Sequence, residues 1–174
     1  RAMLGAIAGD IIGSVYEKNP VKDMNFPLFQ EDSRFTDDTV LTVAVADALL
    51  NESPFADKVK HYARNYPFAG YGGTFIKWMT EEIEGPYNSW GNGSAMRVSP
   101  VGFAYEELED VLRVAGATAE ITHNPPEGIK GAQAVAAAIY LARSGFGKPL
   151  IKDHIQRKFG YDLETTLAEI RPNY

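Results

Sequence analysis

Residues 35–50 read FTDDTVLTVAVADALL, and this stretch decides the fold class. After the two aspartates, apolar residues recur at the three- and four-residue spacing that places them on one side of a helix. The residues on this face are Leu41, Val45, Ala48 and Leu49. Threonine and aspartate at the start are typical of a helix N-terminus. We therefore predict a helix from about Asp38 to Leu50 that packs its apolar face into a core.

The same helical period continues over the rest of the chain, where strand signals are weak throughout. Further helices are predicted over 3–16, from Ser53-Pro54 (a serine cap with proline in the first turn) to near Tyr66, over 74–83, from Ser94 with an interruption near Pro100, and over 106–121, 127–143, 149–158 and 162–169. Residues 20–35 and 85–93 are irregular, and we find no internal repeat or linker. The sequence thus predicts an all-α fold in a single domain over residues 1–174.

The composition is that of an ordinary globular protein and excludes several function classes. The net charge is −6 with no run of Lys or Arg, which argues against a nucleic-acid partner, because binding phosphates favours a basic face. The absence of cysteine excludes disulfides, thiolate catalysis and cysteine metal sites. No apolar run approaches the roughly 20 residues of a membrane span. We interpret residues 2–9 as a buried helix rather than a signal peptide, and predict a cytoplasmic protein with no membrane partner.

The segment Thr36-Asp37-Asp38-Thr39 is the first candidate site. Two adjacent carboxylates and two hydroxyls offer hard oxygen ligands, which suit Mg²⁺, Mn²⁺ or Ca²⁺. The same residue types also serve as plain helix caps, so both interpretations stay open. A second candidate lies on the first predicted helix, where Asp10, Ser14 and Glu17 share one face of an apolar segment. The alternative for this stripe is a solvated face, with Glu17 exposed past the helix end.

The loop Ser89-Trp90-Gly91-Asn92-Gly93 is the third candidate. Two glycines around Asn92 free several backbone amides to point one way, and the following helix adds its N-terminal N–H groups. Such a cradle suits a diphosphate, and Trp90 beside it suits stacking on a nucleobase. The alternative is a glycine-rich turn with a core tryptophan. His123, in a turn after an apolar helix, is the fourth candidate, either as a ligand contact or as a structural histidine.

In this order the pieces resemble the ADP-ribosylglycohydrolase family over roughly residues 3–143. The matching text is GAIAGD at 5–10, GSVYE at 13–17, FTDDT at 35–39 with Thr42, GNGSAMR at 91–97 with Pro100, and Thr122-His123. The resemblance implies a compact, multi-helix orthogonal bundle and a pair of divalent ions, Mg²⁺ or Mn²⁺. It also implies hydrolysis of the bond between ADP-ribose and a side chain, often arginine and in some members serine.

The resemblance also implies roles for single residues. Thr36, Asp37 and Asp38 would bind the metals, with Asp37 and Asp38 acting in catalysis. Glu17 would lie beside them as a ligand or a mobile gate, and is the third expected catalytic residue. Ser89 and the Gly91-Asn92-Gly93 loop would hold the diphosphate and distal ribose, Trp90 would pack on the adenine, and His123 would contact ribose or phosphate. The partner would be an ADP-ribosylated protein or a small ADP-ribosyl compound, and the irregular segment 18–34 would select the acceptor.

One departure from the family pattern concerns the metals. Members have a second metal motif, Asp-x-Asp-Thr, near the C-terminus, and nothing of that form follows residue 143, where the acids are Asp153, Asp162, Glu164 and Glu169. The resemblance therefore implies a C-terminally shortened version of the fold, as a truncation, a fragment or a divergent member. We expect impaired binding of two ions unless another segment supplies the missing carboxylates. The functional expectation is a metal-dependent hydrolase that releases ADP-ribose. The alternative is a non-catalytic ADP-ribose-binding or structural helical protein.

Overall fold

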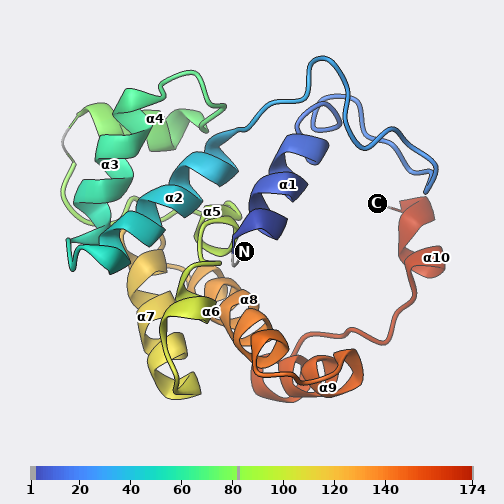
Figure 1. Cartoon of the computed structure of the whole chain (residues 1–174). Helices are drawn as coiled ribbons and strands as arrows, with labels where there is room; N and C mark the ends of the chain where they lie inside the picture. The colour runs from blue at the N-terminus through green and yellow to red at the C-terminus, as the bar shows by residue number, and fades with distance from the viewer. Residues whose placement is uncertain (1–2, 82, 174) are drawn as a thin grey trace.

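The computed structural model describes residues 3–81 and 83–173, which fold into helices and loops without a strand (Figure 1). This confirms the all-α prediction. In chain order the helices are α1 (Leu4–Gly13), α2 (Asp37–Leu50), α3 (Phe55–Asn65), α4 (Gly73–Thr80), α5 (Gly93–Met96), α6 (Val101–Ala104), α7 (Leu108–Glu120), α8 (Pro126–Arg143), α9 (Lys148–Phe159) and α10 (Leu167–Ile170), with a final 3₁₀ turn over Arg171–Asn173.

Helix α2 lies in the main core, as its apolar face predicts. Leu41, Val45 and Ala48 are buried, and Leu49 is half-buried. Helix α3 packs along α2, and α7 packs along α8, so the core is closed by two helix pairs (Figure 1). Burying these side chains stabilises the fold by roughly 1.5–3 kcal/mol for each large aliphatic residue. The core therefore holds the start of α2 in a fixed place.

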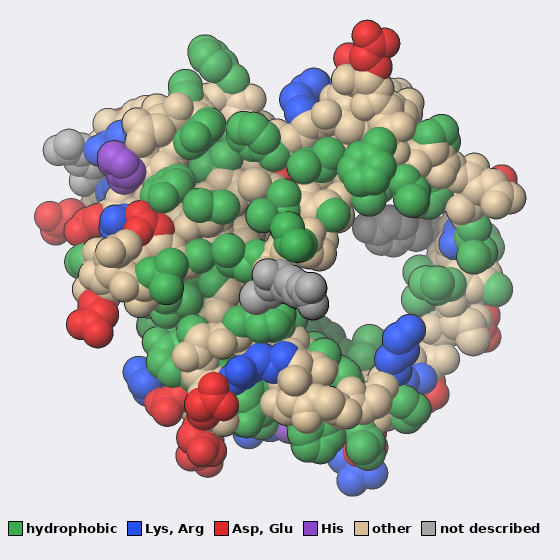
Figure 2. Space-filling model, viewed as in Figure 1, with side chains coloured by type: hydrophobic (Ala, Val, Ile, Leu, Met, Phe, Trp, Pro, Cys, Tyr) green, Lys and Arg blue, Asp and Glu red, His purple; other side chains and the backbone are tan. Residues whose placement is uncertain are grey.

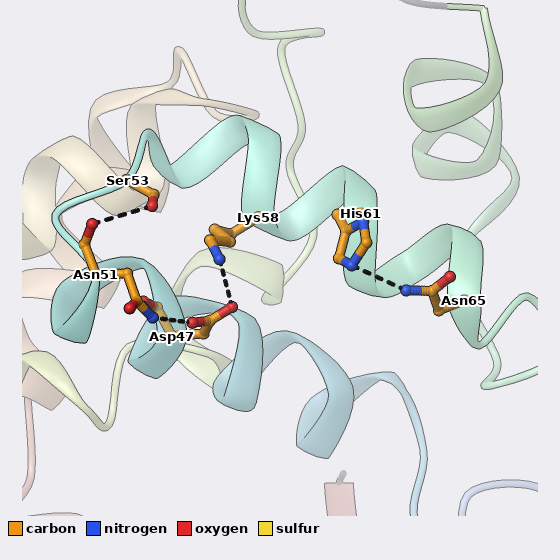
Figure 3. Close-up of polar contacts among 6 residues, drawn as sticks. All are labelled: Asp47, Asn51, Ser53, Lys58, His61 and Asn65. Carbon is orange, nitrogen blue, oxygen red and sulfur yellow. Dashed lines mark hydrogen bonds and ion pairs between the residues drawn. The ribbon is translucent and has the colours of Figure 1, made fainter.

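Polar contacts fix the turn between α2 and α3 (Figure 3). Lys58 Nζ lies 2.7 Å from Asp47 Oδ2, and the Asn51 amide donates to the other carboxylate oxygen of Asp47. The Ser53 hydroxyl donates to the Asn51 carbonyl at 3.2 Å. Because this hydroxyl is used in the turn, Ser53 does not cap α3. Pro54 is the N-cap and the helix begins at Phe55, one residue later than predicted.

The structure corrects the prediction for the first helix in two ways. Helix α1 ends at Gly13 rather than at residue 16, because the Ser14 hydroxyl donates to the Ile11 carbonyl and accepts from the amide of Arg34 as the chain turns away. The helix is also not buried: none of its residues is fully covered (Ala2 lies outside the described residues). Among the described helices, α2 is the one with substantial contact to it. Figure 2 shows hydrophobic side chains around an opening on this face.

The remaining predicted elements differ from the structure mainly at their ends. Helix α4 ends at Thr80, and Glu82, inside the predicted helix, lies outside the described residues. The interruption predicted near Pro100 is found, and it leaves only one turn of helix on each side of it. The predicted helix over 162–169 is wrong for its first half. Asp162 instead accepts hydrogen bonds in a turn, and a capping box of Thr166 and Glu169 starts α10. In the described part of the chain, none of the helices has the length and apolar character needed to cross a bilayer.

A glycine marks the closest approach of α6 to α8. A methyl group added at Gly102 would lie 2.7 Å from Ile139 Cγ2 and 2.9 Å from the carbonyl oxygen of Ala136. We expect Gly102→Ala to lower the free energy of unfolding by about 1–3 kcal/mol, because backbone would have to move. The matched control is Gly5→Ala at an exposed position of helix α1, where an added methyl group meets nothing and helix propensity rises by up to about 1 kcal/mol. Urea unfolding measures both, and equal midpoints for the two variants would contradict this packing.

Candidate active site

Asp10 of α1 holds the start of α2. Its carboxylate accepts four hydrogen bonds, from the amide (2.8 Å) and hydroxyl (2.5 Å) of Thr36 and from the amide (3.1 Å) and hydroxyl (2.5 Å) of Thr39. Helix α2 is therefore capped from another helix, and Thr36 makes no cap with its own side chain. Asp37 and Asp38 lie inside the first turn rather than at the cap position. Neither aspartate therefore occupies the N-cap position, while their place in the first turn is also one that acids favour at ordinary helix starts.

Asp37 and Asp38 form a charged group whose members repel one another. Burial, followed by the neighbouring charge of Asp38, raises the pKa of Asp37 to about 6. Burial, followed by the charges of Asp10 and Glu17, also raises the pKa of Asp38. Glu17 is exposed past the end of α1, as one of the two interpretations had it, yet its charge acts on both aspartates. Sequence segments more than 20 residues apart are therefore brought together here as one acidic group.

A cleft of about 520 Å³ begins at this group. Asp37 lies in its wall together with the loop from Tyr87 to Gly93 and the start of α4 from Gly72 to Phe75. Trp90 also lines the cleft with 77% of its surface exposed, so it is not a core residue. The buried tryptophan of this region is Trp78, which donates to the Gly85 carbonyl at 2.8 Å. One predicted metal residue, Asp37, thus shares a cavity with the predicted anion loop, whereas Thr36 and Asp38 do not line it.

The start of α4 is a wall of the cleft: the sequence predicts a helix over 74–83 but does not assign it to the site. Residues 70–73 read GYGG and are interpretable as a turn, but Gly73 and Thr74 open an eight-residue helix whose first amides have no intrahelical partner. Conversely, the helix expected to support the anion loop from Ser94 is only the single turn of α5. A glycine cluster directly before a helix is the signal that could have pointed to this helix start as a wall of the site.

His123 lies behind the loop rather than in the cleft. Only 1% of its surface is exposed, and both ring nitrogens have partners. Nε2 lies 2.9 Å from the Gly91 carbonyl oxygen, and Nδ1 lies 2.8 Å from the Thr122 hydroxyl. Burial lowers the pKa of His123, so the ring is neutral at physiological pH. In this arrangement the histidine contacts the loop that lines the cleft.

Comparison with known proteins decides the family. The family model described as ADP-ribosylglycohydrolase matches residues 1–171. The chain belongs to the ADP-ribosylglycohydrolase family. The chain is 31% identical to the ADP-ribosylhydrolase ARH3 of Bos taurus and 30% identical to that of Homo sapiens, in each case over 82% of this chain and 49% of the relative. The ADP-ribosylarginine hydrolase Tri1 of Pseudomonas putida (strain GB-1) is 27% identical over 84% of this chain and 47% of the relative. The chain spans about half the length of these curated relatives.

The residues of this ADP-ribosylglycohydrolase chain fit part of a divalent-metal site. Thr36, Asp37 and Asp38 present hard oxygen donors, and the pKa values of the two aspartates are raised by burial and then by neighbouring negative charge, which a cation would neutralise. Within residues 3–81 and 83–173, however, no three His, Cys, Asp or Glu side chains gather as they would around an ion. The donor chemistry therefore fits, while the described residues do not complete a ligand set.

The pKa of Asp37 gives this ADP-ribosylglycohydrolase chain a testable pH dependence. Its folded-state pKa of about 6 lies above the ordinary value of 3.8, so the folded state gains a proton that the unfolded state lacks between these values. Stability from this group is thus lost as pH rises through about 6. We expect Asp37→Asn to raise the melting temperature relative to wild type by about 2–4 °C more at pH 7.5 than at pH 5, after discounting for partial exposure.

The measurement is thermal unfolding with a chelator present. The matched control is Asp57→Asn, an exposed aspartate in the first turn of α3, which should shift the melting temperature equally at both pH values. An Asp37→Asn difference that stays constant between the two pH values would refute the raised pKa.

Proposed function

We propose that this chain acts as a metal-dependent hydrolase that removes ADP-ribose from a modified protein side chain or a related ADP-ribosyl compound. The observation that carries the proposal is the single cleft that joins Asp37 to the loop from Ser89 to Gly93. Its volume of about 520 Å³ lies within the range of small-molecule sites. The names of the curated relatives, ADP-ribosylhydrolase and ADP-ribosylarginine hydrolase, support the same reaction class.

In this proposal the ligand lies along the cleft with its diphosphate on backbone amides. The Gly91-Asn92-Gly93 loop and the first amides of α4 bind the phosphate oxygens, because unpaired N–H groups at a helix start favour anions. Ser89 holds the distal part of the same loop, where its hydroxyl accepts from the Gly91 amide at 3.2 Å. Trp90, largely exposed at the cleft, stacks on the adenine. The ribose that is cleaved then faces Asp37.

Thr36, Asp37 and Asp38 would hold Mg²⁺ or Mn²⁺, with Glu17 beside them. Such an ion would orient the ribose hydroxyls and lower the pKa of a water molecule. Breaking the bond at C1″ develops positive charge on the sugar, and the carboxylates of Asp37 and Asp38 stabilise that charge and accept a proton from the attacking water. The raised pKa of Asp37 brings it closer to neutral pH, where proton transfer is most effective.

A second candidate function is an ADP-ribose-binding protein without catalysis. The observation that favours it is the incomplete set of metal-ligating side chains among the described residues. Because the diphosphate and adenine contacts are separate from the acidic group, binding does not require a complete metal site. For either function we propose the cytoplasm as the compartment.

The test uses peptides that carry ADP-ribose on arginine or on serine, incubated with the protein and with Mg²⁺, Mn²⁺ or a chelator. Release of ADP-ribose that depends on the metal supports the hydrolase. Binding of ADP-ribose without release supports the second candidate. If the protein neither binds nor releases ADP-ribose, both candidate functions are refuted. The two peptides also report the acceptor, for which the irregular segment 18–34 beside the acidic group is the proposed determinant.

A further inference from the structure

Arg97 is a buried cation at the cleft without a matching carboxylate. Its side chain lines the cleft, yet only 1% of the residue is exposed. Nη2 donates to the Thr118 carbonyl at 2.7 Å and to the Thr122 hydroxyl at 2.8 Å, while the buried Nε has no partner. In the described part of the chain, no ion pair includes this guanidinium. A charge buried without a counter-ion costs several kcal/mol, so a structure that keeps one points to an anion that is supplied from outside.

A path of hydrogen bonds connects Arg97 to the loop, and the donor and acceptor of each bond follow from one another. The Gly91 carbonyl can only accept, so His123 donates to it from Nε2. Nδ1 of the neutral ring then accepts from the Thr122 hydroxyl, which in turn accepts from Arg97. Each of the three hydrogen bonds along this path thus joins one donor to one acceptor. The order Arg97, Thr122, His123, Gly91 therefore connects the buried charge to the backbone of the loop.

Packing holds the same residues directly under the loop. A methyl group added at Gly93 would lie 3.7 Å from His123 Cε1 and 3.8 Å from Arg97 Nη1. On the other side, a methyl group added at Gly128 of α8 would lie 2.7 Å from His123 Cδ2. The histidine is thus wedged between α8 and the loop. Of the charged side chains that line the cleft, Asp37 is the acid and Arg97 is the cation.

We propose that Arg97 is a positioning residue for the anionic part of the ligand. Its buried charge attracts a diphosphate into the cleft, and its hydrogen-bonded chain through Thr122 and His123 fixes the Gly91-Asn92-Gly93 loop that receives the diphosphate. The inference rests on the proposed function for the identity of the ligand as ADP-ribose. It assigns His123 to the support of the loop, in place of the contact with ribose or phosphate that the family resemblance implied.

The test compares Arg97→Met with Arg113→Met by NMR titration of three probes: ADP-ribose, inorganic pyrophosphate and adenosine. Arg113 is an exposed arginine on α7 paired with Asp110, so its variant loses the same net charge away from the cleft. We expect Arg97→Met to weaken binding of ADP-ribose and pyrophosphate by roughly tenfold or more and to change adenosine binding by less than about twofold. Arg113→Met should match wild type for all three.

The outcomes separate this inference from the proposed function. Wild-type affinity of Arg97→Met for ADP-ribose, or an equal loss for adenosine, overturns the inference and leaves the function standing. Pyrophosphate binding that depends on Arg97, without any binding of ADP-ribose to wild type, overturns the function and supports the inference. Wild-type protein that binds neither anion overturns both.

A second variant keeps the inference testable if Arg97→Met does not fold. Thr122→Val keeps the guanidinium and the side-chain shape but breaks the chain to His123. We expect roughly threefold to tenfold weaker binding of ADP-ribose and faster amide hydrogen exchange at Gly91, Asn92 and Gly93. Unchanged affinity and unchanged exchange in Thr122→Val would overturn the positioning role.

Discussion

Asp37→Asn and Asp38→Asn are each expected to abolish the release of ADP-ribose from modified peptides, with a fall in rate of roughly 100-fold or more. Asparagine keeps the size of the side chain, so the start of α2 stays in place. It removes the negative charge that stabilises the sugar cation, the acceptor for the proton of water, and a hard ligand for Mg²⁺ or Mn²⁺. The rate is measured as free ADP-ribose released in the presence of the metal.

Two controls make this result specific. Asp57→Asn changes an exposed aspartate in the first turn of α3 and should leave the rate unchanged. Binding of free ADP-ribose in the presence of a chelator should be unchanged or tighter in the Asp37 variant, because one negative charge is removed from the cleft. Wild-type turnover by both variants would exclude the two aspartates from the reaction. If the variants lose metal binding but the wild type itself shows no activity, the second candidate function is favoured.

The helices of this fold are readable from the sequence because their apolar periods are local. The face of α2 that carries Leu41 and Val45 is buried as its spacing predicts. The family resemblance follows from short motifs in a fixed order, and the match over residues 1–171 confirms it. The roles given to Asp37, Asp38 and the Gly91-Asn92-Gly93 loop stay predictions, although one cleft brings Asp37 and the loop together.

Features that depend on contacts between distant residues could not be predicted. The position of His123 in a turn is compatible with exposure or burial, and the missing side chain of Gly128 on another helix decides for burial. The sequence does not distinguish Arg97 from the other cationic residues, because its burial depends on residues distant in the chain. The incomplete burial of α1 is another example. Its apolar sequence favours a buried helix, but burial also needs a surface that covers it, and among the described helices only α2 has substantial contact with it.

Asp10→Ala is expected to have the largest effect on the shape of the acidic group. Alanine removes the acceptor of four hydrogen bonds from Thr36 and Thr39, which together cap the start of α2. It also removes a charge that repels Asp38, and that gain offsets part of the loss. The loss is larger, because hydrogen bonds to a charged acceptor contribute about 1.5–3 kcal/mol each and a lost cap costs about 1 kcal/mol. Because all four hydrogen bonds are only part-buried, water replaces much of what is lost, and we expect a net loss of about 2–4 kcal/mol in the free energy of unfolding.

Because Asp10 fixes the backbone around Asp37 and Asp38, binding of Mn²⁺ should weaken together with stability. Asp10→Asn should lie between wild type and Asp10→Ala, since an amide oxygen still accepts while the amide nitrogen cannot. The control is Asp23→Ala, which removes a single hydrogen bond to the Asn25 amide in an exposed loop and should cost less than about 0.5 kcal/mol. Urea unfolding and calorimetric titration of Mn²⁺ measure the two effects. Unfolding midpoints of Asp10→Ala and Asp23→Ala that coincide with wild type would show that α2 begins where it does without help from α1.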